Sequence, residues 1–288
     1  MPNDNQPDNL NVQWTSTSMP AQAPARATTF TAMDERRSSQ SLDDDAIKRM
    51  MKGSTPSFLD RYGSCIVTLA LIAINVVVFV VEVLMSHSLD IDSYTLFDMG
   101  AMFAPAVQSA ADLYRFVAPM FLHVDLMHLL FNMAALYSVG IMLEGFLGRW
   151  NYLLLYFIGG ITGNVVSYVA DMLTGSMVVS AGASTSIFGL FVAAAMLGVL
   201  SNGPRGQRAA LLQYSKGFLG VIVINIVYTL AMPSISISGH LGGAIGGLIA
   251  MFIIPSRNLR VPNVVRIVVA VAWAAAVGYA LVSMGVLP

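Results

Sequence analysis

The sequence predicts an all-α, polytopic membrane protein, on three observations. Hydrophobic residues make up 56% of the chain and charged residues only 11%, whereas an average soluble domain has about 25% charged residues. The apolar residues form runs of roughly 20, the length of a helix that crosses a bilayer. Nearly all Lys and Arg residues fall before the first run or after the second, fourth and sixth runs. The net charge of −1 implies nothing about nucleic acid, and no basic cluster suggests it, so nucleic acid is not an expected partner.

Residues 1–60 differ from the rest in composition. They are rich in Pro, Asn, Ser, Thr and Gln and contain no sizeable apolar run. Such a segment cannot bury enough surface to order itself, so we expect a disordered N-terminal tail. It also lacks the apolar core of a signal peptide.

Seven apolar segments follow the tail. We predict spans at 64–85, 124–143, 151–170, 181–200, 217–232, 237–254 and 265–286. If the tail is cytoplasmic, 14 of the 15 Lys and Arg residues lie inside, and only Arg115 lies outside. Because basic residues favour the cytoplasmic side, we predict a cytoplasmic N-terminus and an outside C-terminus. The second, fourth and sixth spans then run from outside to inside.

The outside loop, 86–122, is too apolar for a solvated loop and too broken for a span. We expect it to dip into the outer membrane interface. Tyr114 and Arg115 would suit the headgroup level, where aromatic and basic side chains anchor.

Unusual polar residues fall near the outside ends of the three inward-running spans. Ser184 lies near the start of the fourth span, His240 near the start of the sixth, and His123, His128 and Asn132 at the second. Ser184 and His240 are each the fourth residue of their predicted spans, which places them at a depth of about 6 Å at 1.5 Å per residue. An ionisable side chain in a span is costly and indicates a functional site. The alternative for each residue alone is structural: a serine bonded to its own helix, or a histidine tying two helices together.

Glycines give the sixth span a flat face. Gly239, Gly243 and Gly247 recur every fourth residue, beside the pair Gly242 and Gly246. Small residues at this spacing let two helices approach closely. If the fourth span is the partner, His240 comes within hydrogen-bond reach of Ser184, the contact that a serine nucleophile requires.

His128 and Asn132 are four residues apart, hence on one helical face. Two neutral donors beside a nucleophilic serine suggest an oxyanion hole. The open alternative is a polar pair that ties the second span to a neighbour.

Several of these stretches resemble the rhomboid family. GASTSIFGL contains a G-x-S signature, HVDLMHLLFN an H-x4-H-x3-N signature and GHLGGAIGG an H-x2-G-x3-G helix. LYRF at 113–116 and EGFLGRW at 144–150 are also similar to family motifs. The resemblance, from about residue 60 to 256, implies a six-helix intramembrane serine protease core (61–256) and a seventh C-terminal transmembrane helix (257–288), the secretase-like arrangement.

The resemblance also implies roles for single residues. Ser184 would be the nucleophile and His240 the general base, while His128, Asn132 and the Ser184 N–H would form the oxyanion hole. Supporting roles fall to Gly182 before the serine, His123, Phe188 against the imidazole, Gly243 and Gly247. The sequence departs at Thr185, where the family usually has Gly, and this side chain would narrow the site.

The predicted activity is cleavage of single-span membrane proteins near their outer ends, in a water-containing hollow beside the lipid bilayer. Lateral entry of the substrate beside the fifth span is expected by family analogy. No cofactor or metal is expected, and the membrane would be the plasma membrane or one of the secretory pathway. Two rival classes are an inactive rhomboid-like protein that binds membrane clients, and a channel or transporter. The channel would need polar groups across several spans, yet the inner halves of the second, fourth and sixth spans are nearly free of charge.

Overall fold

The computed structural model describes residues 63–213, 216–217 and 236–288. The predicted tail, 1–60, and nearly all of the predicted fifth span, 217–232, lie outside the described residues. The described part is helical, without strands. Its long helices are α4 (Ile66–Ser86), α6 (Leu126–Leu147), α7 (Arg149–Thr174), α8 (Ser184–Leu200), α10 (Ile237–Ile253) and α11 (Asn263–Ser283).

Four of these helices are long and apolar enough to cross a membrane, namely α4, α6, α7 and α11. The other two, α8 and α10, are apolar helices of 17 residues each. The predicted all-α membrane fold is therefore confirmed. The predicted start of the fourth span was wrong. The helix begins at Ser184 and not at 181, because Gly182 has a φ of 144°, which no α-helix can contain.

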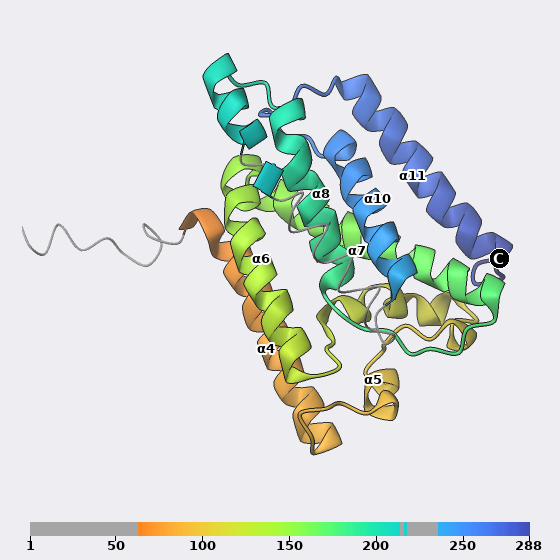
Figure 1. The fold of residues 1–288 in the computed structure, drawn as a ribbon. Helices are drawn as coiled ribbons and strands as arrows, with labels where there is room; N and C mark the ends of the chain where they lie inside the picture. The colour runs from red at the N-terminus through yellow and green to blue at the C-terminus, as the bar shows by residue number, and fades with distance from the viewer. Residues whose placement is uncertain (1–62, 214–215, 218–235) are drawn as a thin grey trace, which may run out of the picture. The chain divides into compact units, whose positions relative to one another are not determined.

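The packing centres on α7. Helices α8 and α10 pack against α7 and against each other, α4 packs on α6, and α11 lies along α10 and α7 (Figure 1). The amino ends of α8 and α10 therefore lie close together, although 53 positions separate Ser184 from Ile237.

The glycines of α10 form two contact faces. A Cβ on Gly243 would lie 2.0 Å from the carbonyl oxygen of Thr185, and one on Gly247 would lie 2.1 Å from that of Gly189, so this face touches the backbone of α8. A Cβ on Gly242 would lie 2.6 Å from Val166 Cβ, and Gly246 meets Thr162 of α7 in the same way. The predicted approach of the fourth and sixth spans is thus confirmed.

Gly247→Ala should push α10 away from α8, because the new methyl group has no space. We expect a loss of about 1–3 kcal/mol in unfolding free energy, as for other overpacked cores. Thermal unfolding in detergent measures this loss. The control is Gly145→Ala in α6, where a Cβ meets nothing within 4 Å. Equal melting temperatures for the two variants would contradict this packing.

Helix α4 buries one stripe of side chains, Thr68, Leu71, Asn75, Phe79 and Glu82. Near its start, Glu144 of α6 accepts hydrogen bonds from the backbone N–H groups of Val67 and Thr68 at 2.9 and 2.8 Å, and from the Thr68 hydroxyl at 2.8 Å. These bonds satisfy N–H groups that a helix start leaves unpaired. They join α4 to α6 at the end far from Glu82.

The segment between α4 and α6 folds into short helices: α5 (Ser93–Asp98), η2 (Ala104–Ala106), η3 (Ala110–Phe116) and η4 (Ala118–Phe121). The prediction of a headgroup anchor was wrong for Arg115, which is buried. Its guanidinium donates to the carbonyl oxygens of Phe97 and Ala101 at 3.0 and 2.9 Å, and lies 4.4 Å from the centre of the Phe97 ring. Buried carbonyl oxygens need donors, so Arg115 holds the segment between α4 and α6 together instead.

Candidate active site

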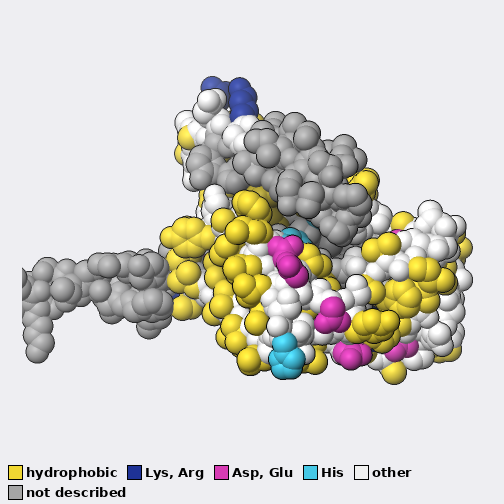
Figure 2. All heavy atoms as spheres, turned by 60° about the horizontal axis from the view of Figure 1, so that its bottom comes forward, with side chains coloured by type: hydrophobic (Ala, Val, Ile, Leu, Met, Phe, Trp, Pro, Cys, Tyr) yellow, Lys and Arg dark blue, Asp and Glu magenta, His cyan; other side chains and the backbone are white. Residues whose placement is uncertain are grey.

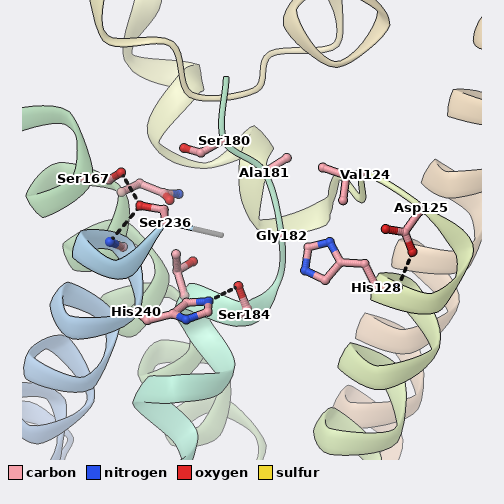
Figure 3. Close-up of a pocket in the computed structure, with 13 residues that line it drawn as sticks. Val124, Asp125, His128, Ser167, Ser180, Ala181, Gly182, Ser184, Ser236 and His240 are labelled. Atoms are coloured by element: carbon pink, nitrogen blue, oxygen red, sulfur yellow. Dashed lines mark hydrogen bonds between the residues drawn. The ribbon is translucent and has the colours of Figure 1, made fainter. Parts of the chain in front are cut away.

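Ser184 and His240 are in direct contact. The Nε2 atom of His240 lies 2.7 Å from Ser184 Oγ, within hydrogen-bond distance (Figure 3). Ser184 is the first residue of α8, and His240 is in the first turn of α10. With this geometry the imidazole can take the hydroxyl proton when the oxygen attacks a carbonyl carbon.

The loop before Ser184 is held from the α4–α6 segment. Ser180 exchanges two backbone hydrogen bonds with Met102, at 2.8 and 2.9 Å, and the Gly182 N–H donates to the Pro119 carbonyl at 2.9 Å. A Cβ on Gly182 would lie 2.8 Å from His128 Cε1 and 3.1 Å from Ser184 Oγ, so both the φ and the space require glycine. The first helical bond of α8 comes from the Ile187 N–H. The N–H of Ser184 is therefore not used by the helix and can serve a ligand.

The ring of Phe188 packs against the imidazole of His240. The two rings stack with centroids 4.2 Å apart and an angle of 17° between their planes. Phe188 is one turn after Ser184 on α8, so a single helix presents both the hydroxyl and the surface on which the histidine rests. Stacking fixes the plane of the imidazole and directs Nε2 at Ser184.

The two candidate oxyanion donors have different surroundings. His128 lines the cavity across from Ser184, with its backbone N–H bonded to the N-cap Asp125 at 2.7 Å (Figure 3). Asn132, buried as well, does not line the cavity, because four residues of helix carry it about 6 Å farther along α6. Its Nδ2 atom is buried and has no hydrogen-bond partner in the described part of the chain, so the pairing of these two donors stays a prediction.

His123 is fully buried and packs edge-on against His128, with ring centroids 5.3 Å apart at 65°. Burial, and secondarily the neighbouring His128, lowers the pKa of His123 to about 3. The His123 ring is therefore neutral at pH 7, and it supports the His128 ring by packing against it.

The cavity lined by Ser184, His240 and His128 has a volume of about 40 Å³ and a partly polar lining. Sequence reasoning missed three of the lining residues, namely Asn164, Ser167 and Ser236. Ser167 and Ser236 bond to each other at 2.9 Å, and the Asn164 amide donates to the Phe116 carbonyl at 2.9 Å. Asn164 and Ser167 share a face of α7 three residues apart, a signal that was present in the sequence.

Within the described ranges, no group of three His, Cys, Asp or Glu side chains is placed to hold a metal ion. The functional groups at the cavity are the Ser184 hydroxyl, the His240 imidazole and nearby hydrogen-bond donors.

The comparisons with known proteins identify the family of this chain. The sequence model of the rhomboid domain matches residues 110–257, half of the chain. The chain is 38% identical over 137 residues to rhomboid protease GluP of Bacillus subtilis (strain 168), a match of 48% of this chain and 25% of GluP. It is 29% identical over 226 residues to rhomboid protease AarA of Providencia stuartii, covering 72% of this chain and 80% of AarA.

A third relative is rhomboid-like protease 3 of Toxoplasma gondii, 29% identical over 175 residues, which cover 60% of this chain and 64% of that protein. The match of the domain model includes α6, α7, α8 and α10, and hence every residue that we place at the cavity. The chain is an integral, multi-pass membrane protein that belongs to the rhomboid family.

Proposed function

We propose that this protein is a serine endopeptidase that cleaves transmembrane segments within the membrane. The observation that carries this proposal is the 2.7 Å contact between Ser184 Oγ and His240 Nε2. A serine hydroxyl is a weak nucleophile until a base takes its proton, and this imidazole is in place to do so.

The reaction follows from the positions of the groups. His240 accepts the proton as Ser184 Oγ attacks the peptide carbonyl. The N–H of Ser184, the His128 ring and the Asn132 amide stabilise the negative oxygen. His240 then gives the proton to the leaving amine, which leaves an acyl-serine. A water molecule, activated by the same imidazole, hydrolyses the ester and restores the serine. The small cavity would hold the water that hydrolysis within a bilayer needs.

The substrates in this proposal are single-span membrane proteins. An amide inside a helix is already hydrogen-bonded and shielded, so the segment that is cut must unwind at the cavity. Helix-weakening residues near the substrate's outer end would favour this step.

The same proposal includes a cytoplasmic N-terminus, with the cavity opening to the outside of the plasma membrane or of a secretory-pathway membrane. The charges support it. Figure 2 shows acidic side chains spread over the face formed by the α4–α6 segment, with Lys and Arg confined to one edge of the view. The exposed residues Arg149, Arg205, Arg257 and Arg260 belong to the opposite ends of the helices. Basic residues favour the cytoplasmic side.

A fluorophosphonate probe tests the nucleophile directly. The purified protein in detergent should become labelled at Ser184, because the probe reacts with serines that a neighbouring base activates. Peptide mapping locates the label, and His240→Ala should prevent labelling. Labelling at another serine, or none at all, would contradict the proposal and would favour the inactive, client-binding alternative.

A further inference from the structure

Helix α4 contains an acidic side chain that the reaction does not use. Glu82 is 0% exposed and lies on the buried stripe of α4, near the end of the helix that leads into the α4–α6 segment. An ionisable group inside a membrane helix is costly, and an apolar residue would pack there at lower cost. The position therefore needs an explanation in the contacts that the carboxyl group makes.

The carboxyl group of Glu82 binds the backbone N–H of a residue in the segment before α6. Its Oε1 atom accepts a hydrogen bond from the N–H of His123 at 3.0 Å. Its Oε2 atom is buried and has no hydrogen-bond partner in the described part of the chain. The buried carboxyl group of Glu82 therefore serves to hold the short segment between η4 and α6 in place.

That segment sets where His128 lies. It is tied to α4 through the Glu82–His123 bond, and to the start of the α4–α6 segment through the bond from the Ile91 N–H to the Val124 carbonyl at 2.8 Å. Asp125 then caps α6, and the ring of His123 packs edge-on against that of His128. A shift of this segment would move His128 relative to Ser184.

We propose that Glu82 is a positioning residue for the oxyanion site, acting through His123 to hold the His128 ring opposite Ser184. This inference rests on the proposed function and adds to it a group on a helix that contributes nothing to the cavity lining. Because Glu82 touches no reacting atom, its loss should lower kcat while leaving the KM for a transmembrane substrate unchanged.

Asn75 supplies a matched control on the same helix. It is also 0% exposed and lies two turns before Glu82 on the same stripe, but its Nδ2 atom donates to the Leu71 carbonyl of its own helix at 2.7 Å. Asn75 also interacts with Tyr156 of α7, whose hydroxyl donates to the Met120 carbonyl at 3.1 Å. Asn75→Leu leaves this hydroxyl and the Glu82–His123 bond in place, and removes only the buried amide from α4.

The experiment compares Glu82→Leu, Glu82→Gln and Asn75→Leu in the full chain, with cleavage of a single-span substrate in detergent. We expect kcat of Glu82→Leu to fall by about 10- to 100-fold, less than the loss of an oxyanion donor itself, with KM within about twofold. Glu82→Gln keeps the acceptor oxygen and should restore kcat. Asn75→Leu should keep the wild-type kcat even if its melting temperature falls as far as that of Glu82→Leu. Equal loss of kcat in Glu82→Leu and Asn75→Leu, or no rescue by Gln, would overturn the proposal.

A double-mutant cycle with His128→Ala tests the route of the effect. If Glu82 acts through His128, Glu82→Leu should cause no further loss of kcat in the His128→Ala background. Multiplying effects would mean a general structural role and would overturn the proposal.

Hydrogen exchange gives a readout that does not depend on proteolysis. Loss of the bond should make backbone exchange about fivefold faster over residues 122–128 in Glu82→Leu, and not in Asn75→Leu. Unchanged exchange would overturn the proposal. If the wild-type protein does not cleave, the proposed function fails, and the exchange rates alone decide whether Glu82 holds this segment.

Discussion

Ser184→Ala is expected to abolish cleavage of a transmembrane substrate. Removal of the nucleophile in other serine proteases lowers kcat by about 10⁶-fold, and a loss of that size would be complete in a reconstituted assay. The fold should survive, because Ser184 is the first residue of α8 and donates no helical N–H bond from its own backbone. Product formation from the purified variant in proteoliposomes is the measurement.

Ser201→Ala is the matched control for that experiment. Ser201 lies just past the other end of α8, where its hydroxyl accepts a hydrogen bond from the Gly203 N–H at 3.2 Å. This variant should cleave at the wild-type rate. Undiminished turnover in Ser184→Ala would exclude the proposed nucleophile.

His240→Ala is expected to cause a loss as large as that of Ser184→Ala. Serine and histidine act as one unit, so the double variant should be no slower than either single variant. The variant loses the stacking on Phe188, but α8 and α10 should stay packed, since their glycine contacts do not involve the imidazole. Single-turnover cleavage rates of the three variants provide the comparison.

His87→Asn controls for the loss of an imidazole. His87 is exposed at the end of α4 with a φ of 53°, a backbone conformation that Asn tolerates well. Its turnover should match that of the wild-type protein. Further loss in the Ser184/His240 double variant would indicate that the two residues act independently, which would contradict the dyad.

The helices themselves were largely predictable from the sequence. Apolar length located α4, α6, α7 and α11, and the boundaries were within a few residues, for example 64–85 against Ile66–Ser86. The short segments between α4 and α6 were not predictable, because hydrogen bonds from Arg115 and to Pro119 hold them, and these partners are distant in sequence.

The candidate site was predictable in part. The contact of Ser184 with His240 followed from charge counting, helix rise and the glycine spacing of α10. The role of Asn132 stays a prediction, because spacing on one face gives direction around a helix but not depth along it, and Asn132 does not line the cavity. Ser167 and Ser236, which join α7 to α10 beside the serine, received no attention because single hydroxyls in spans are usually local.

The sequence by itself determined that this chain is a helical membrane protein of the rhomboid family, because apolar length, charge asymmetry and short motifs are properties of neighbouring residues. Only the tertiary structure decided which polar groups work together. Glu82 and His123 are 41 positions apart, yet they meet at 3.0 Å. Such a contact depends on how α4, the loop and α6 pack in three dimensions, and no local pattern records it.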